Sequence, residues 1–353
     1  MRTNLSSQIS LNHVSPRYYK PENAVERSVL TRLEKIPTDI FETIEEGVRR
    51  IADEVAAKIQ ERQREGKFCT LAIGTGTSLR PLFTELVRRH KDEGLSFRNV
   101  VVFNLYEFYP LTEGNGSTFG QLNSLFLSQT DIDRQNVFTI DGSIPQNAIS
   151  EHCRLYEQRI QTFGGIDIVL MGIGREGNIG MNEPGSHASS PTRLILLDAT
   201  SRSEAARNWG VDNLPPCSIT MGVQTILSAR KIYLLTWGED KADIIQKAVE
   251  ENINDTLPAS FLQLHNNVNV CIDLAAASHL TRIQRPWLVT SCEWNDKLIR
   301  SAIVWLCTLL NKPILKLTNK DYNENGLSEL LALYGSAYNV NIKVFNDLQH
   351  TIT

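Results

Sequence analysis

The feature that most constrains the fold of this chain is the repeated alternation of short apolar runs with longer segments of helical periodicity. The short runs, rich in β-branched residues and typical of buried strands, are residues 68–73, 100–104, 166–171, 193–197, 232–236 and 268–272. The segments with helical spacing are residues 40–59, 79–91, 148–163 and 241–252. Strands that alternate with helices predict an α/β fold, with a doubly wound, mostly parallel sheet and flanking helices. Ligands of such sheets bind beyond the carboxyl ends of the strands, so the residues after each run are the candidates for function.

The pattern divides the 353 residues into three parts. Residues 1–30 are polar, contain Pro16 and Pro21 and show no sustained period, so we expect an N-terminal arm. Residues 31–285 carry the alternating pattern and are long enough to form one α/β domain with a large core. The pattern changes again in residues 286–353, which we expect to form a separate extension.

The C-terminal part begins with a strongly apolar helix at residues 298–310. Two further runs, 314–317 and 342–345, are interpreted as strands around a helix at 327–333, which predicts a small C-terminal α/β extension. The sequence stops without a charged tail or a capping element. This ending fits a linker towards a covalently linked C-terminal domain that is absent from the chain.

The composition excludes several classes of partner. Acidic residues number 40 and basic residues 36, a net charge of −4, so there is no basic surplus for nucleic acid. The longest apolar stretch, residues 302–310, is well short of the roughly 20 residues that span a bilayer, and residues 1–12 lack the apolar core of a secretory signal. The six cysteines are scattered, which favours reduced thiols over a disulfide or zinc framework. We therefore expect a cytoplasmic protein that has neither nucleic acid nor a membrane as a partner.

A loop rich in glycine and hydroxyl groups follows the first apolar run. It reads Gly74-Thr75-Gly76-Thr77-Ser78 and precedes a helix. Glycines let backbone amides approach an anion, the hydroxyls add donors, and the helix presents its N-terminus, so the loop predicts a phosphate site. An ordinary tight turn with Ser78 as the helix cap is the alternative.

A second glycine loop, residues 172–177, matches the Gly-x-Gly-x-x-Gly pattern of dinucleotide-binding folds. Such a site needs a helix that starts within the glycine motif. Here residues 182–186, Asn-Glu-Pro-Gly-Ser, break the segment instead. The sequence therefore argues against a nicotinamide cofactor.

Charged side chains occur in the same loops. Glu107 lies among aromatic residues after the run 100–104, and Glu176 and Glu183 follow the run 166–171. Acid–base chemistry on a sugar needs several such groups, because protons are delivered to and taken from different atoms. Solvated loop charges are the alternative. Lys241, near the start of a helix, either holds a phosphate or pairs with its acidic neighbours.

Taken in order, these loops resemble the glucosamine-6-phosphate deaminase/isomerase family, whose relatives include the 6-phosphogluconolactonases. Residues 103–108 are similar to the family's Phe-Asn-Met-Asp-Glu-Tyr segment. Residues 172–184 resemble its Gly-x-Gly-x-Asp-Gly-His-x-x-Phe-Asn-Glu-Pro, and residues 261–265 its Leu-Gln-Leu-His. The step Asn182-Glu183-Pro184 favours the deaminase branch, because lactonases have Phe-Pro-Gly there.

The resemblance implies a site and a reaction. A phosphate would be bound by Gly76 and Thr77 of the loop, by Arg207 (Arg202 being the other candidate) and by Lys241. The reaction opens the sugar ring, moves a proton from C2 to C1 and releases ammonia to leave fructose 6-phosphate. The resemblance implies no metal or organic cofactor. We expect a homo-oligomer whose partner is a small sugar phosphate.

The chain departs from the family at catalytic positions. Tyr106 stands where the aspartate that abstracts the C2 proton is expected, and a phenol would need its pKa lowered by about three units, roughly 4 kcal/mol, to act as a base at pH 7. Asn178 replaces the ring-opening histidine and cannot shuttle a proton, and Glu176 replaces an aspartate. An allosteric phosphate site of some members needs a lysine two residues after Arg193. Ile195 stands there, so we expect that regulation to be weak or absent.

Three functions compete on this basis. The first is a deaminase/isomerase in which Glu107 or Glu176 takes over the proton transfer. The second is a sugar-phosphate-binding domain without catalysis that regulates a partner, and the third is a lactonase-like hydrolase, which Asn182-Glu183-Pro184 disfavours. We also expect Glu183 and Glu107 to face one cleft, because both follow sheet strands.

Overall fold

The computed structural model describes residues 14–111, 116–210 and 214–352. The chain forms two compact units, one of Glu34–His279 and one that joins Met1–Leu33 to Leu280–Thr353. None of the helices within the described ranges combines the length and the apolar character that a membrane crossing requires.

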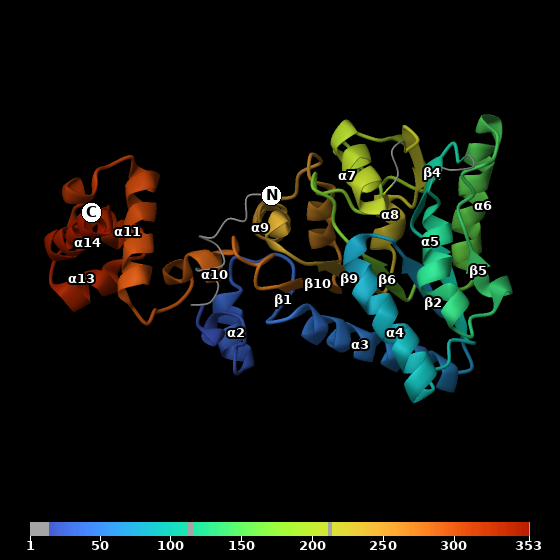
Figure 1. The fold of residues 1–353 in the computed structure, drawn as a ribbon, viewed down its shortest axis with the longest axis horizontal. Helices are drawn as coiled ribbons and strands as arrows, with labels where there is room; N and C mark the ends of the chain where they lie inside the picture. Colours follow the sequence, from blue (N-terminus) through green and yellow to red (C-terminus); the bar gives the residue numbers. More distant parts are fainter. Residues whose placement is uncertain (1–13, 112–115, 211–213, 353) are drawn as a thin grey trace. The chain divides into compact units, whose positions relative to one another are not determined.

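A seven-stranded parallel sheet organises the larger unit (Figure 1). Its spatial order is β1-β10-β9-β6-β2-β3-β5, and every pair in it is parallel. The bounds are β1 (Thr38–Phe41), β2 (Cys69–Ile73), β3 (Val100–Asn104), β5 (Val137–Phe138), β6 (Ile168–Met171), β9 (Lys231–Thr236) and β10 (Val268–Asp273). The doubly wound, mostly parallel sheet predicted from the apolar runs is confirmed. Strands β2, β3 and β6 are buried at every residue, as expected where helices cover both faces.

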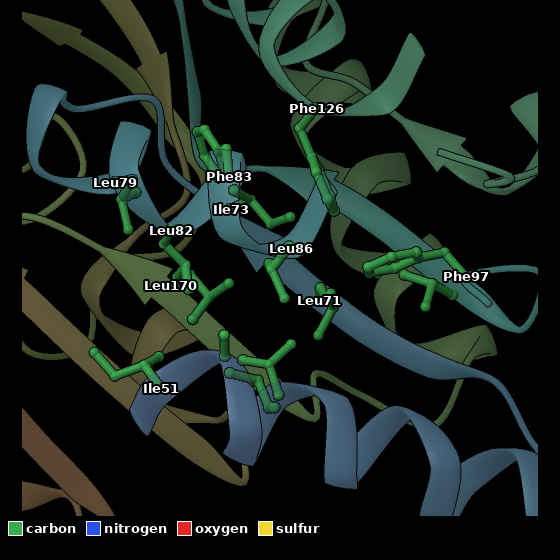
Figure 2. Close-up of a cluster of buried hydrophobic side chains, with 14 of the residues drawn as sticks. Ile51, Leu71, Ile73, Leu79, Leu82, Phe83, Leu86, Phe97, Phe126 and Leu170 are labelled. Carbon is green, nitrogen blue, oxygen red and sulfur yellow. The ribbon is translucent and has the colours of Figure 1, made fainter. Parts of the chain in front are cut away.

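The larger unit contains seven α-helices in the described part of the chain. They are α3 (Ile44–Arg64), α4 (Arg80–Glu93), α5 (Thr118–Leu125), α6 (Ile149–Thr162), α7 (Ala199–Trp209), α8 (Val223–Leu227) and α9 (Ala242–Glu250). Helices α3 and α4 lie side by side and cover one face of the sheet. Figure 2 shows their apolar side chains, among them Ile51, Leu82 and Leu86, meeting Leu71 and Leu170 of the strands. This cluster fixes the position of the loop between β2 and α4.

One predicted helix begins later than its periodicity indicated. Ile40 lies in strand β1, and α3 starts only after the cap residue Thr43, whose side chain accepts a hydrogen bond from the backbone N–H of Glu46. Ile40 and Ile44 are four residues apart, so the strand residue happened to continue the helical spacing.

A second, antiparallel sheet of three strands adjoins the site. Its order is β4-β8-β7, with β4 (Tyr106–Tyr109), β7 (Arg193–Leu196) and β8 (Cys217–Thr220). Residues 193–197 were expected to be a strand of the parallel sheet. That expectation is wrong, because Arg193 pairs antiparallel with Thr220 of β8, and Thr220 also pairs with Tyr106. An apolar run identifies a strand but not the direction of its partner.

The smaller unit is helical throughout its described residues. Its α-helices are α2 (Ala24–Leu30), α10 (Thr281–Gln284), α11 (Asp296–Leu310), α12 (Asn319–Glu324), α13 (Ser328–Tyr334) and α14 (Ala337–Ile352). Helices α11, α12, α13 and α14 enclose a separate apolar core, to which Trp287 also belongs.

The predicted α/β extension at the C-terminus is therefore wrong. Residues 314–317 contain the 3-10 turn η9 (Ile314–Lys316), and residues 342–345 lie inside α14. Ala337, Val340 and Val344 are all buried, and their spacing of three and four residues is that of one helix face. Of the predicted N-terminal arm, residues 1–13 lie outside the described residues, and residues 24–30 form α2.

Candidate functional site

The loop Gly74–Ser78 connects β2 to the N-terminus of α4 at the carboxyl edge of the parallel sheet. Gly74 is packed so closely that a Cβ atom there would lie 3.3 Å from Cδ1 of Leu105. Thr75 is buried, whereas Thr77 is exposed. The alternative of Ser78 as a helix cap is wrong, because the loop enters a 3-10 turn at Thr77 and α4 only at Arg80, neither with a side-chain cap.

Strand β9 is tied to this loop. The indole Nε1 of Trp237 donates a hydrogen bond of 2.9 Å to the carbonyl oxygen of Ser78. Trp237 follows β9 and precedes the short turn η6 (Glu239–Lys241), so this bond holds the start of the Lys241 segment against the glycine loop.

The second glycine loop lies beside the first. A Cβ at Gly172 would lie 2.7 Å from Oγ of Ser78, so the two loops are in close contact and a larger residue would require the Ser78 side chain to move. The loop then folds on itself, because the Gly174 N–H donates 3.0 Å to the carbonyl of Asn178 and a Cβ at Gly174 would clash with the Asn178 side chain. The next described helix is α7, which begins at Ala199, so this loop lacks the helix of a dinucleotide site.

Tyr106 is buried at the start of β4, and its phenol contacts the glycine loop Gly74–Ser78. The Thr75 hydroxyl donates to the phenol oxygen at 3.3 Å. Burial raises the pKa of Tyr106, with the hydrogen bond from Thr75 acting in the opposite direction. The phenol therefore stays protonated at neutral pH and offers a hydrogen-bonding group rather than a base.

Glu107 is also buried, and four donors surround its carboxylate. Oε1 accepts from the backbone N–H groups of Phe108 and Thr118, both at 2.9 Å. Oε2 accepts from the Ser117 hydroxyl at 2.8 Å and from the Phe119 N–H at 3.1 Å. Three of these donors belong to the first turn of α5, so the carboxylate holds the N-terminus of that helix against β4. Its acceptor capacity is used within the fold.

Glu183 and Asn178 differ from Glu107 because each keeps a buried acceptor atom without a partner. Glu183 is 5% exposed, and its Oε2 accepts from the Ser201 hydroxyl at 2.9 Å. Its Oε1 has no hydrogen-bond partner among the described residues, and the same is true of Oδ1 of Asn178, which is 7% exposed. Unpaired buried acceptors are costly, which indicates that a ligand or water donates to them.

Burial is also the main cause of a raised pKa at Glu183. Hydrogen bonds from the Ser201 hydroxyl and from the backbone of Asp198 oppose this rise, and the negative charges of Asp198 and, to a smaller extent, of Glu176 add to it. Glu176 itself is exposed. A carboxyl group with a raised pKa gains and loses its proton at a pH nearer to neutral than an ordinary glutamate does.

The predicted cations lie on α7 and at the start of α9. Lys241 Nζ is 2.8 Å from Oε1 of Glu204, so it pairs with a distant glutamate rather than with its acidic neighbours in sequence. Arg207 is exposed, three residues after Glu204 on α7. Arg202 donates 3.1 Å to the carbonyl of Leu214.

The structure thus brings Tyr106 and the start of the Trp237–Lys241 segment into contact with the loop Gly74–Ser78. The contacts of Glu107 and of Glu183 involve separate residues, with α5 for the first and α7 for the second. The sequence analysis did not identify Ser201 and Glu204 as site residues. Their spacing of three residues, which places both on one side of a helix, was the pattern that could have indicated them.

Arg193 has partners inside the fold. It donates to Oδ1 of Asn182 at 2.9 Å and to the Ser186 hydroxyl at 2.8 Å.

Within the described ranges, no group of three or more His, Cys, Asp or Glu side chains is arranged to hold a metal ion.

The fold is that of a parallel α/β domain with a glycine- and threonine-rich loop between a strand and a helix at the carboxyl edge of its sheet. Residues 42–271 match the family model of glucosamine-6-phosphate isomerases/6-phosphogluconolactonase. The chain belongs to this family.

Several relatives support this assignment. A glucosamine-6-phosphate deaminase-like protein of Bacteroides thetaiotaomicron is 67% identical over 355 residues, which cover 100% of this chain and 54% of that protein. The chain therefore spans about half the length of this relative. Glucosamine-6-phosphate deaminase 1 of Bacillus subtilis is 36% identical over 228 residues, 64% of this chain and 93% of the relative.

Solved structures show the same fold. A monomeric glucosamine-6-phosphate deaminase superimposes with a TM-score of 0.65 at 35% identity, covering 69% of this chain and 100% of that one. The 6-phosphogluconolactonase of Trypanosoma brucei superimposes with a TM-score of 0.57 at 18% identity, covering 70% and 99%, which shows the fold alone.

Proposed function

We propose that the larger unit binds an amino-sugar phosphate and acts on it by acid–base catalysis, as a deaminase/isomerase that releases ammonia from glucosamine 6-phosphate to leave fructose 6-phosphate. The observation that carries the proposal is the buried carboxyl group of Glu183, with its unpartnered Oε1 and its raised pKa. A carboxyl group of this kind can deliver a proton to a sugar oxygen and, once ionised, accept another.

The other residues take supporting roles in this proposal. The amide of Asn178 would orient the ligand by hydrogen bonds, since its Oδ1 is buried and unpartnered, but it transfers no proton. Exposed Glu176 acts through its charge, which favours the protonated form of Glu183. Gly74, Thr75, Gly76 and Thr77 would bind the phosphate with Lys241 and Arg207. Glu107 keeps a structural role.

A second candidate function is binding of the sugar phosphate without turnover. The observation that favours it is the buried phenol of Tyr106, whose pKa is raised at the position where the family resemblance places the C2 base. In that case the domain would serve as a regulatory or binding unit of a longer protein.

One experiment separates the two candidates. Ammonia release from glucosamine 6-phosphate is measured beside binding of the same compound by calorimetry, for the unchanged chain and for Glu183→Gln. Catalysis through Glu183 predicts that the variant still binds but loses about 10²-fold or more of the release rate. The matched control is Glu61→Gln, whose carboxylate is 47% exposed on α3 and should change neither quantity.

Other results would decide against the proposal. Binding without ammonia release by the unchanged chain supports the second candidate, and gain of release in Tyr106→Asp would then show that only the base is missing. Absence of binding by the unchanged chain at millimolar ligand contradicts both.

A further inference from the structure

Glu204 of α7 forms an ion pair with Lys241, the lysine that the proposed phosphate site would use. Its Oε1 lies 2.8 Å from Nζ of Lys241, and the two side chains are only 16% and 12% exposed. Its Oε2 accepts a hydrogen bond of 3.0 Å from the backbone N–H of Arg175, whose guanidinium Nε is 3.7 Å from Oε1. A backbone amide, a lysine and an arginine around two oxygens are the donors that bind a phosphate group.

This arrangement lies at the glycine loop. The charge of Glu204 is close enough to Tyr106 to raise the pKa of that phenol. The same phenol accepts the hydrogen bond from Thr75, which is part of the loop. Lys241 closes the turn that follows Trp237, whose indole is bonded to Ser78. Tyr106 and Trp237 thus both contact the glycine loop, and Lys241, the partner of Glu204, lies four residues after Trp237.

The charges around Glu204 balance. Lys241 is neutralised by Glu204, and the Arg175 guanidinium lies between Glu204 and Asp240, 3.7 Å from each. A dianionic phosphate that approached Lys241 would meet a group of side chains with no net positive charge and a carboxylate at contact distance. Like charges placed side by side oppose binding strongly when water is largely excluded.

We infer that Glu204 is a specificity-determining residue that competes with the phosphate group for Lys241. Its carboxylate has to leave Lys241 before a sugar phosphate can bind there. The inference rests on the phosphate-binding half of the proposed function and not on turnover. It implies that the chain binds phosphorylated ligands more weakly than its loop and its lysine would on their own. The alternative is that Glu204 orients Lys241 towards the phosphate, and it predicts the opposite effect of removing the carboxylate.

The test is calorimetric titration with three probes: inorganic phosphate, glucosamine 6-phosphate and unphosphorylated glucosamine. Glu204→Gln removes the charge, and Glu204→Ala also removes the hydrogen bond while favouring the helical conformation of α7. Both variants should bind the two phosphorylated probes at least about tenfold more tightly, with no change for glucosamine. In a Lys241→Gln background the same substitutions should give a clearly smaller gain, because only the direct repulsion between the carboxylate and the phosphate is then relieved.

The matched control is Asp243→Asn. Asp243 forms a similar pair, 2.7 Å from Lys247, on the exposed side of the neighbouring helix α9. This variant removes one negative charge nearby without freeing Lys241, so phosphate affinity should change less than twofold. Melting temperatures of all variants report whether each is folded.

Unchanged or weaker phosphate binding in both Glu204 variants overturns the inference, as does failure of the two phosphorylated probes to bind any folded variant. A gain that is as large in the Lys241→Gln background also contradicts it. The outcome is separate from that of the ammonia assay: tighter phosphate binding without ammonia release would support the inference and contradict catalysis.

Discussion

Replacing Glu107 by glutamine tests whether this carboxylate has a structural or a chemical role. The carboxylate accepts two hydrogen bonds at each oxygen, from Phe108 and Thr118 at Oε1 and from Ser117 and Phe119 at Oε2. A glutamine keeps one acceptor oxygen and presents an NH₂ group to the second pair of donors. The Ser117 hydroxyl can rotate and accept from this group, but the backbone N–H of Phe119 cannot.

The magnitude follows from that count. One buried N–H left without an acceptor costs about 1–3 kcal/mol, and the retained bonds weaken because bonds to charged groups contribute about 1.5–3 kcal/mol against about 1 for neutral ones. We expect Glu107→Gln to lower the free energy of unfolding by about 3 kcal/mol. For a domain of this size that is a fall of roughly 6–12 °C in melting temperature.

The assay is thermal and urea unfolding followed by circular dichroism, with the exposed Glu61→Gln as the matched control. Ammonia release per folded molecule at 25 °C should remain near that of the unchanged chain. A variant that melts at the original temperature but has lost ammonia release would refute the reasoning, because it would show that Glu107 is needed for chemistry and not for the position of α5.

Two other predictions concern the buried groups of the site. Because burial raises the pKa of Glu183 in the folded state, the fold binds this proton more tightly than the unfolded chain, and stability falls as the pH rises from the unfolded value of about 4.3 through the folded one. Glu183→Gln should therefore match the unchanged chain in urea unfolding at pH 4 and exceed it at pH 8. Equal stability of the two chains at both pH values would contradict the raised pKa of Glu183. Tyr106→Phe should cost about 0.5–1.5 kcal/mol of stability, for the bond from Thr75, and keep most ammonia release. Complete loss of release in a folded Tyr106→Phe would identify the phenol as a catalytic group.

The central strands were predictable because their surroundings are uniform. Strands β2, β3 and β9 lie inside a parallel sheet between helices, so their sequences are continuous apolar runs. Strands β4 and β8 escaped prediction because they are four residues long and carry polar residues at buried positions, such as Glu107 and Ser218, whose partners come from elsewhere in the fold.

The site was predictable only in part, for the same reason. The glycine loop could be located because its composition reflects local backbone geometry. The pairing of Lys241 with Glu204 joins residues 37 positions apart and depends on how α7 packs, which spacing does not encode. Likewise, the sequence places Glu107 at the end of a strand but does not show that α5 returns to bind its carboxylate.

Helix α7 contacts both charged ends of the proposed site. Ser201, in its first turn, donates to Glu183, and Glu204, one turn later, binds Lys241. The two contacts share a rigid backbone, so a displacement of the helix that frees the lysine also changes the hydrogen bond to the buried carboxyl group. Occupancy of the anion site and protonation of Glu183 are then linked equilibria, and linkage is reciprocal. We therefore expect phosphate binding at the proposed site to be accompanied by the uptake or release of a proton, and phosphate affinity to depend on pH beyond the titration of the phosphate itself.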